Sequence, residues 1–489
     1  MAKRVIVIGA GEAGRMVVRE IDAAPGSGFE VVGFLDDDSG LHGSIIEGRP
    51  VLGSCDSLID VAPSKKIEEA IVAVPSGSRE FVRRVIALCR DAGISCKIVP
   101  GIIEIIKGPV RLEQVRDVHP EDLLGREMVE FDDEPLRKGL AGRRIMVTGA
   151  GGSIGGELCR QIGRFDLAEL HLLGRGENQI FEIEHEIRTL YPSLKVEAVI
   201  ADIREEKEIA RLIARLKPDY VYHTAAHKHV HYMEAFPEEA VANNVFGTVN
   251  LIRAARDGGV ARFVMISTDK AVKPEGVMGA TKRLAEFLMT DYSNEIETPL
   301  LLTVRFGNVL GSRGSVVPLF ISQIRTGGPV TVSHPDATRF FMSLREACML
   351  VVQVSLMGNG GEIFVLRMGP PVNIMDMARD LIALHGLRSG VDIDIEIAGL
   401  RPGEKLHEDL VVEGEEVMES PHERILVARP ALPAGWDREA VLRTLERLVD
   451  EGDTGGIRDY LGEIIPDARL EKNRSDGTSG ERRRKAGPL

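Results

Sequence analysis

Two stretches of the chain repeat one device, in which a β-branched strand leads through a glycine-rich turn into an amphipathic helix. The first places RVIVI at residues 4–8 before GAGEAG at residues 9–14, and the second places RIMV at residues 144–147 before TGAGGSIG at residues 148–155. Strands alternate with helical stretches after both turns, as in parallel sheets that helices cover on both faces. We therefore predict an α/β protein of two tandem doubly wound parallel-sheet domains.

The composition excludes several classes of protein. Acidic residues exceed basic ones by 75 − 61 = 14, which disfavours general nucleic-acid binding, so we expect no nucleic-acid partner. No apolar run approaches the ~18 residues that span a bilayer, and the N-terminus runs directly into a strand, which leaves no room for a signal peptide. The five cysteines are scattered, as reduced thiols are. We expect a soluble, cytoplasmic protein without a transmembrane segment.

Composition and periodicity divide the chain into five parts. We expect an N-terminal nucleotide-binding domain over residues 1–118, a charged linker over 119–141, a second domain over 142–433 with a smaller lobe mainly over 309–430, a helical segment over 434–470 and a disordered tail over 471–489. The tail has almost no apolar side chains that could bury surface, and its basic cluster is interpreted as solvated.

The first glycine-rich turn fits the dinucleotide-binding fingerprint. Its glycines are Gly9, Gly11 and Gly14, and Asp36 follows at the end of the second predicted strand, where an acidic side chain can accept hydrogen bonds from a ribose hydroxyl. Two interpretations stay open. The turn binds a nucleotide, or its glycines only allow a helix and a strand to pack closely.

The second glycine-rich turn predicts a pyrophosphate site at the N-terminus of the helix that begins near Ser153. The acidic residue expected after the next strand is missing, and Arg175 stands where it could pair with a 2′-phosphate, so we expect NADP rather than NAD. Glu177 could instead reach the ribose. The candidate cofactor-binding residues of this region are Gly149, Gly152, Ser153, Ile154, Gly155, Arg175, Glu177, Asp202 and Ile203, the last two at the adenine edge.

The fourth strand of the second domain ends in HTAAHKHVH at residues 223–231. The small residues Ala225 and Ala226 let a cofactor lie against the backbone, and Lys228 is placed to face cofactor phosphate or substrate. The four histidines match no established ligand spacing, so we expect no metal site.

The fifth strand ends in Thr268, Asp269 and Lys270, which the topology places at the carboxyl edge of the sheet. Ten residues later, Met278 and Lys282 take the positions of the Tyr-x-x-x-Lys pair of short-chain dehydrogenases, which shares one helical face. The tyrosine is thus replaced by methionine.

These motifs resemble those of the nucleotide-sugar 4,6-dehydratases of capsule, O-antigen and protein-glycan synthesis, which are extended short-chain dehydrogenase/reductases with a Rossmann-like fold. The matching segments are STDKAVKP at residues 267–274, VMGATKR at 277–283, NNVFGT at 243–248, RFGNVLG at 305–311, HPDATRFFM at 334–342 and LRPGEK at 400–405. The resemblance covers about residues 140–430, and the first domain resembles the nucleotide-binding domain that precedes it in long members.

The resemblance implies a reaction on UDP-N-acetylglucosamine without net redox change. The sugar is oxidised at C4 by NAD(P)⁺, loses the C5 proton and the C6 hydroxyl as water, and receives the hydride at C6. Lys270 is our candidate C5 base, with a pKa lowered by desolvation and by Lys282 nearby. Asp269 is the candidate acid at the C6 oxygen, with a pKa raised by burial, and Thr268 binds the C4 oxygen.

Met278 cannot take the C4 proton, so either chemistry is lost or the proton passes through Thr268, the ribose hydroxyls and Lys282. The resemblance implies that the methionine form is active and retains the C5 configuration. It also implies a homo-oligomer, dimer or hexamer. Asn243 is a further cofactor candidate. The candidate substrate-binding residues are Lys228, Asn308, Arg313, Arg339, Arg401 and Glu404. A nucleotide-sugar 4- or 5-epimerase and a non-catalytic nucleotide-sugar sensor or scaffold are the alternatives.

Overall fold

The computed structural model describes residues 2–24, 26–74, 77–99, 115–119, 122 and 131–470. The expected tail over 471–489 and most of the expected linker lie outside the described residues. Among the described residues, no helix combines the length and the apolar character that crossing a bilayer requires.

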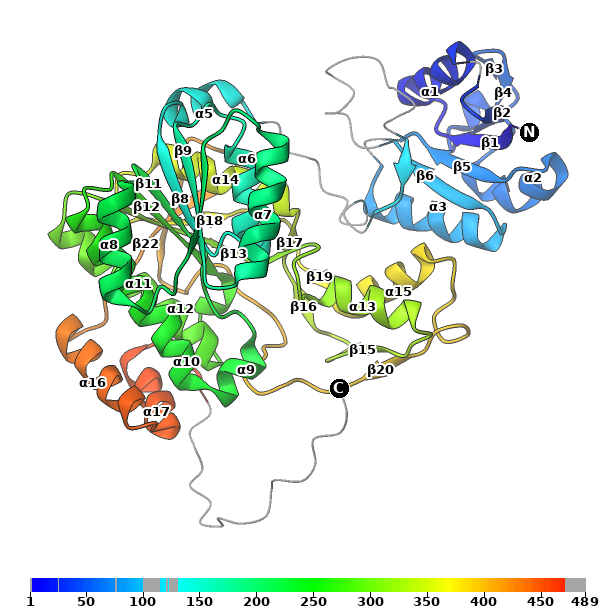
Figure 1. Ribbon diagram of the computed structural model, residues 1–489. Helices are drawn as coiled ribbons and strands as arrows, with labels where there is room; N and C mark the ends of the chain where they lie inside the picture. Colours follow the sequence, from blue (N-terminus) through cyan, green and yellow to red (C-terminus); the bar gives the residue numbers. More distant parts are fainter. Residues whose placement is uncertain are drawn as a thin grey trace.

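The N-terminal domain is built around a sheet with the strand order β2-β1-β5-β6-β7, in which β7 alone runs antiparallel to its neighbour. Two short strands, β3 and β4, form a separate pair, and helices cover both faces (Figure 1). The elements are β1 (Lys3–Ile8), α1 (Glu12–Ala23), β2 (Phe29–Leu35), β3 (Ile45–Ile46), β4 (Arg49–Pro50), α2 (Leu58–Lys65), β5 (Glu69–Val72), α3 (Arg79–Asp91), β6 (Ser95–Ile98) and β7 (Arg116–Asp117).

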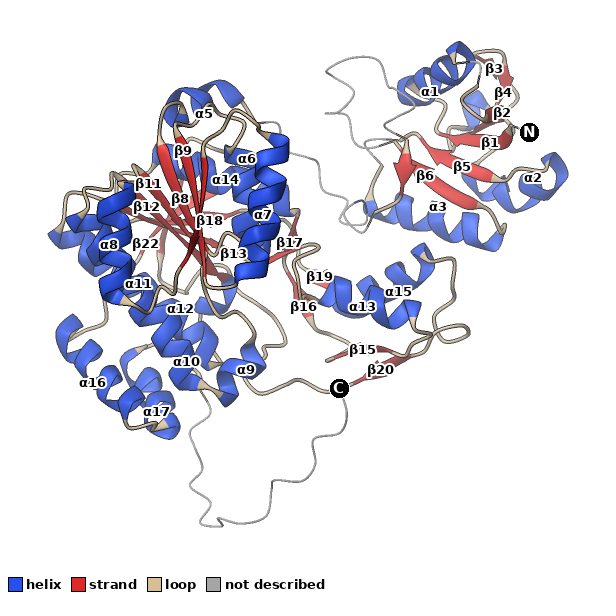
Figure 2. Cartoon of the chain, in the orientation of Figure 1, coloured by secondary structure: helices blue, strands red, loops and turns tan. Residues whose placement is uncertain are grey.

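The second domain contains a larger sheet with the order β10-β9-β8-β11-β12-β13-β18-β22-β21, parallel from β10 to β18. Figure 2 shows these strands fanned side by side between helices. The strands are β8 (Arg144–Thr148), β9 (Glu169–Gly174), β10 (Val196–Ile200), β11 (Tyr220–His223), β12 (Arg262–Thr268), β13 (Leu300–Phe306), β18 (Ile363–Leu366), β21 (Glu416–Glu419) and β22 (Ile425–Arg429). The predicted α/β class with doubly wound parallel sheets is confirmed.

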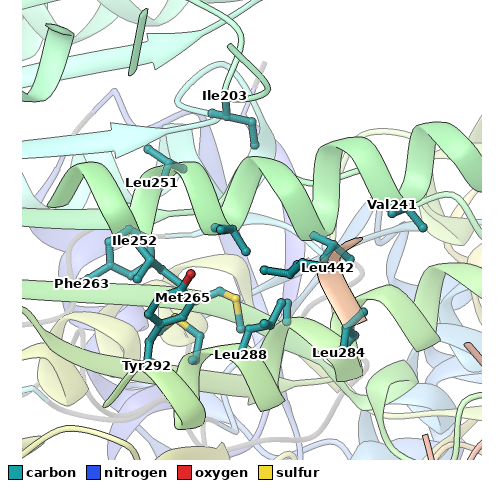
Figure 3. Packing of buried hydrophobic residues seen from close by; sticks show 14 of the residues in the cluster. Ile203, Val241, Leu251, Ile252, Phe263, Met265, Leu284, Leu288, Tyr292 and Leu442 are labelled. Atoms are coloured by element: carbon teal, nitrogen blue, oxygen red, sulfur yellow. The ribbon is translucent and has the colours of Figure 1, made fainter. Parts of the chain in front are cut away.

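Two apolar layers, one on each face, enclose this sheet, so its central strands are buried on both faces. One face is covered by α5 (Asp133–Leu140), α6 (Ser153–Ile162), α7 (Glu177–Leu190) and α14 (Leu344–Met357). The other is covered by α8 (Glu206–Leu216), α9 (Val230–Ala235), α10 (Pro237–Val241), α11 (Gly247–Asp257) and α12 (Val277–Glu295), with a π-helical turn over Ala242–Phe246 before α11. Figure 3 shows part of this second layer, in which Leu251 and Ile252 of α11 and Leu284 and Leu288 of α12 belong to one buried cluster.

The C-terminal segment adds to the second layer. The helical segment expected over 434–470 contains two helices, α16 (Arg438–Asp450) and α17 (Thr454–Ile464), and the chain turns between them at Gly452, which has a φ of +65°. Asp453 then caps α17 through the Gly456 N–H at 2.8 Å. Leu442 of α16 is buried in the same cluster as α12 (Figure 3), so the two helices belong to the packed second domain.

The linker expected over 119–141 ends earlier than predicted. Helix α5 lies inside this range, and its Leu136 and Leu140 are fully buried in the core of the second domain. Asp132 caps the helix by accepting from the Glu134 N–H, and Pro135 is tolerated because it lies in the first turn. The charges and the proline that suggested a linker therefore belong to a helix start.

The smaller lobe expected mainly over 309–430 is not one continuous insertion. Its own core joins α13 (Val316–Arg325), β15 (Val330–Val332), α15 (Ile374–Leu384) and β20 (Ile395–Ile397), with short pairs β14 (Asn308–Val309) to β17 (Phe341–Met342) and β16 (Thr338–Arg339) to β19 (Val372–Asn373). Between these segments, α14 and β18 return to the main domain. On its outer side, Asp380 of α15 accepts from Arg83 of α3 at 2.6 Å, so the lobe contacts the N-terminal domain.

A buried ion pair joins α12 to β13. Glu286 and Arg305 are both fully buried, and the two carboxylate oxygens accept from Arg305 Nε at 3.1 Å and Nη2 at 2.8 Å. Arg283 and Glu415 extend the network at 2.9 Å each. Burial alone would raise the pKa of Glu286, but the guanidinium groups of Arg305 and Arg283 outweigh burial and lower this pKa to about 2.

Replacing Glu286 by Gln removes the fully buried carboxylate that pairs with Arg305 and Arg283 and leaves Glu415 to balance the two guanidinium groups, so we expect the free energy of unfolding to fall by about 3–5 kcal/mol. Urea unfolding at pH 7 followed by circular dichroism measures this loss. The control Glu184→Gln removes an exposed i,i+4 partner of Arg188 and should cost no more than about 1 kcal/mol. Equal losses in the two variants would contradict the role of the buried pair.

Candidate active site

The second glycine-rich turn lies between β8 and α6, at the carboxyl edge of the large sheet. Gly149 has a φ of +69°, and a Cβ on it would lie 2.7 Å from the Ala225 backbone nitrogen. A Cβ on Gly155 would lie 2.3 Å from the Gly149 carbonyl oxygen. Since both positions exclude a side chain, helix α6 packs directly against the turn.

The N-terminus of α6 is open to an anion. Its N-cap residue, Gly152, has no side chain to accept from the first N–H groups of the helix. A cavity of about 280 Å³ lies there, lined by Gly152, Ser153 and Arg313 among others. The free N–H groups and the helix dipole suit a pyrophosphate. Ile154 packs against the apolar core instead, so its side chain does not line the cavity.

The ends of β9 and β10 differ from the prediction. Arg175 Nη1 lies 3.7 Å from Asp202 Oδ2, so a carboxylate shares the place expected for a 2′-phosphate. Burial would raise the pKa of Asp202, but hydrogen bonds from Arg204 outweigh it and lower the pKa. Glu177 begins α7 and is exposed. Ile203 is buried in the core (Figure 3), so its side chain does not face an adenine.

His223, at the end of β11, is held in one tautomer by two threonines. Thr248 Oγ1 donates its proton to the Asn244 carbonyl at 2.7 Å, so it accepts from His223 Nε2 at 3.0 Å. The other ring nitrogen, Nδ1, then accepts from Thr148 Oγ1 at 2.8 Å. Burial, together with the nearby Lys282 ammonium, lowers the pKa of His223 to about 3, so the ring is neutral.

The segment after His223 lies against the glycine-rich turn. Ala225 N–H points to Thr148 Oγ1 at 3.4 Å, and the exposed Ala226 follows it. Lys228 Nζ donates to the Arg313 carbonyl at 2.8 Å; partial desolvation, then the charge of Lys270, lowers the pKa of Lys228. Asn243 is buried and donates to Asn244 Oδ1 at 3.0 Å.

The turn after β12 brings the three predicted catalytic groups together. Asp269 is fully buried, and its Oδ1 accepts from Thr268 Oγ1 and from Lys270 Nζ, both at 2.9 Å. Its second oxygen, Oδ2, has no hydrogen-bond partner among the described residues. Lys270 also donates to Asn308 Oδ1 at 3.1 Å.

Glu408 is the group that sequence reasoning missed. Its carboxylate is almost fully buried and lies 3.6 Å from Lys270 Nζ and 3.8 Å from Arg339 Nε. Burial raises the pKa of Glu408, against the opposing charge of Lys270. The only available signal was its place three residues after the LRPGEK segment, which alone assigns no role.

The pKa expected for Lys270 is wrong in direction. Desolvation lowers it, but the carboxylates of Asp269 and Glu408 outweigh desolvation, and the pKa of Lys270 is raised. Lys282 shows the opposite balance: it is buried, makes no side-chain hydrogen bond to any described residue, and burial lowers its pKa to about 8 against a smaller effect of Glu286. Met278 is buried in the core beside it.

The predicted substrate residues fall into two groups. Asn308 and Arg313 border the site, and the Arg313 N–H donates to Ser153 Oγ at 2.9 Å. Arg339 is only 7% exposed and gives both terminal nitrogens to the chain, to Thr338 O, Leu406 O, Lys405 O and Glu404 Oε1, so it holds the 404–408 loop rather than a free phosphate. Arg401 is exposed on that loop, and Glu404 is engaged by Arg339 at 3.1 Å.

The first glycine-rich turn is held in place by the carboxylate of Asp36. Asp36 Oδ2 accepts from the Ala10 N–H at 2.7 Å and Oδ1 accepts from the Asp38 N–H at 2.9 Å, so the carboxylate already bridges two backbone segments. A Cβ on Gly14 would lie 1.9 Å from the Gly9 carbonyl oxygen, which explains the glycine by packing. Gly11 has open space around it. Both interpretations of this turn therefore stay open.

Comparison with known proteins covers most of the chain. Residues 145–430 match the family model of polysaccharide biosynthesis proteins, and residues 1–100 match a model of a CoA-binding domain. The capsular polysaccharide biosynthesis protein CapD of Staphylococcus aureus is 42% identical over 425 residues, which span 86% of this chain and 71% of CapD.

Two further known proteins match part of the chain. UDP-glucose 4-epimerase of Rickettsia canadensis is 36% identical over 278 residues, 55% of this chain and 77% of the epimerase. The X-ray structure of Pen from Bacillus thuringiensis superposes with a TM-score of 0.56 at 32% identity, over 61% of this chain and 90% of Pen.

The neutral, buried His223 predicts a pH dependence of stability. Unfolding restores its ordinary pKa of 6.5, so between pH 6.5 and 3 the unfolded chain binds a proton that the folded chain does not. Stability then falls as the pH falls, by up to about 1.4 kcal/mol per pH unit from this group. Urea unfolding at pH 7.5, 6.5 and 5.5 should show a flatter profile for His223→Asn than for the unchanged chain. Parallel profiles would contradict the assignment.

Proposed function

Because the chain belongs to the polysaccharide biosynthesis protein family, we propose that it is a nucleotide-sugar 4,6-dehydratase. The proposed substrate is UDP-N-acetylglucosamine or a related UDP-N-acetylhexosamine, and the product is the 4-keto-6-deoxy sugar nucleotide, used for polysaccharide or glycoprotein glycans. We further propose that the C5 configuration is retained.

One observation carries the proposal. A carboxylate, an ammonium and a hydroxyl converge at Asp269, Lys270 and Thr268, on the strand that ends at the same edge of the sheet as the open N-terminus of α6. Elimination of water needs an acid and a base beside a sugar that is oxidised at the same time, and these groups supply both.

The residues of the glycine-rich turn fit a nicotinamide dinucleotide. Gly149, Gly152, Ser153 and Gly155 would hold its pyrophosphate, and the bound cofactor would take a hydride from C4 and give it back at C6. Arg175 is half-exposed, and its 3.7 Å contact with Asp202 is longer than the 2.7 Å contact that Arg204 makes there. Arg175 is thus available to a 2′-phosphate, which supports NADP.

Proton removal from the C4 hydroxyl needs a route that avoids Met278. Lys282 has a pKa of about 8 and no hydrogen-bond partner among the described residues, so a fraction of its amine is neutral near pH 7. We propose that Lys282 finally accepts the proton of the C4 hydroxyl. Thr268 and the ribose hydroxyls of the cofactor would relay this proton.

Lys270 can remove the C5 proton only as a neutral amine. Its ammonium lies 3.6 Å from Glu408, whose pKa burial raises, so Glu408 can hold the proton that Lys270 gives up before it acts. The free Oδ2 of Asp269 would carry the proton that leaves with the C6 oxygen as water. Lys228, Asn308, Arg313 and Arg401 would meet the diphosphate of the substrate.

A nucleotide-sugar 4-epimerase is the second candidate, because the Rickettsia canadensis epimerase matches 55% of the chain at 36% identity. Epimerisation shares the transient ketone but eliminates nothing at C6, so it does not need the acid at Asp269.

Incubation of the protein with UDP-N-acetylglucosamine should lower the mass of the sugar nucleotide by one water. Asp269→Asn should reduce this dehydration by at least about 100-fold, since it removes the C6 acid. Mass spectrometry of the products measures both. An unchanged mass with a shifted sugar configuration would establish the epimerase, and no change at all would support a sensor.

Lys270 is tested separately through the C5 hydrogen. In heavy water, the unchanged enzyme should incorporate deuterium at C5 during turnover, and Lys270→Ala should abolish that incorporation. Exchange that persists in Lys270→Ala would remove this residue as the base.

Denaturing the purified protein should release a nicotinamide dinucleotide, and chromatography identifies it. We expect NADP from the unchanged chain and a shift toward NAD in Arg175→Ala, because the cation that meets the 2′-phosphate is lost. Gly155→Ala is the control for the site as a whole and should release little of either, because its Cβ would lie 2.3 Å from the Gly149 carbonyl oxygen. NAD alone from the unchanged chain would refute the role of Arg175.

A further inference from the structure

His171 is a fully buried histidine in the middle of β9 whose two ring nitrogens have no hydrogen-bond partner among the described residues. A neutral imidazole has one donor and one acceptor, and burying both without partners is unfavourable, because water would satisfy them in the unfolded chain. Buried polar groups in folded proteins nearly always have a partner. A bound cation would give the unprotonated ring nitrogen a partner.

Two glutamates converge on the same point. Glu169 precedes His171 by two residues and therefore lies on the same face of β9. Glu197 is the direct neighbour of His171 on the parallel edge strand β10. One ligand atom from each of the three residues lies within 4.8 Å of the others, as neighbours around a single cation do.

Each carboxylate is oriented by a surface cation that engages one of its oxygens. Lys195 Nζ lies 2.8 Å from Glu169 Oε1, and Arg215 Nη1 donates to Glu197 Oε1 at 2.7 Å. No described residue hydrogen-bonds Oε2 of either glutamate. Outer partners of this kind fix metal-binding carboxylates in place. The Glu197 side chain is 32% exposed, so a cation can enter from solvent along it.

We propose that Glu169, His171 and Glu197 form a binding site for a divalent cation of the zinc class. One imidazole nitrogen and two carboxylate oxygens suit zinc, with water as the fourth ligand. The site lies in the amino-terminal half of β9, whereas Arg175 follows its carboxyl end, so it is separate from the proposed active site. It would clamp the edge strand β10 to β9.

Sequence reasoning could not find this site, because only two of the ligands are close in sequence. Glu169 and His171 are two residues apart within a strand, a spacing without special meaning, and Glu197 joins them only through the pairing of β9 with β10.

The test uses the full-length chain without an affinity tag, stripped with a chelator and then titrated with zinc sulfate. We expect about one zinc ion per chain by elemental analysis and a higher melting temperature with zinc. His171→Gln and Glu197→Gln should each weaken zinc binding by at least about tenfold and remove the thermal shift. If His171→Gln fails to fold, Glu197→Gln still provides the test, because the Glu197 side chain is partly exposed.

His185→Gln, on the exposed face of α7, is the matched control and should bind zinc as the unchanged chain does. Cobalt substitution adds a direct readout, because the visible absorption of bound cobalt should disappear with either ligand variant. The proposal is overturned if the stripped chain takes up no zinc, or if His171→Gln and Glu197→Gln bind it as tightly as His185→Gln. These readouts do not depend on dehydratase activity.

Discussion

The buried pair of Glu286 and Arg305 connects the structural core to the chemistry. Its carboxylate also accepts from Ser267 Oγ at 2.6 Å, one residue before Thr268, so a single acidic group fixes both the end of β12 and the middle of α12. Arg305 extends the same constraint to Glu415, beyond the loop that carries Glu408. Four segments, namely the end of β12, α12, β13 and the loop of Glu415, thus share one polar network, and a displacement of α12 or β13 would leave a charge buried without its partner.

The two lysines of the proposed site illustrate how the surroundings decide the behaviour of one side-chain type. Lys270 lies between two carboxylates and keeps its proton more tightly than an ordinary lysine, whereas Lys282, whose nearest acidic influence is Glu286, holds its proton less tightly because burial dominates. The balance at Lys270 suits a group that stays protonated until a neighbouring carboxylate accepts its proton. The balance at Lys282 suits a group that exchanges a proton near neutral pH.

Patterns that depend on local rules were predictable from the sequence. The β-branched runs, the glycine-rich turns and the motif after β12 predicted the α/β class, the glycine-rich start of α6 and the cluster of Thr268, Asp269 and Lys270. Contacts made across the fold were not predictable. Glu408 reaches Lys270 only through the return of the chain from the lobe, and Arg339 is occupied by backbone carbonyls that no motif reveals. The charged start of α5 was indistinguishable from a linker in the sequence, because only two residues of this helix, Leu136 and Leu140, are buried.

The interrupted course of the smaller lobe has a mechanical consequence. The chain leaves the main sheet after β13, comes back for α14 and β18, leaves again and returns through the loop of Glu408 to β21 and β22. A lobe tied down at four crossings cannot swing like a flap on a single hinge. Because Glu408 lies on the returning segment and Lys270 on the turn after β12, a displacement of that segment would change the 3.6 Å separation between the two charged groups.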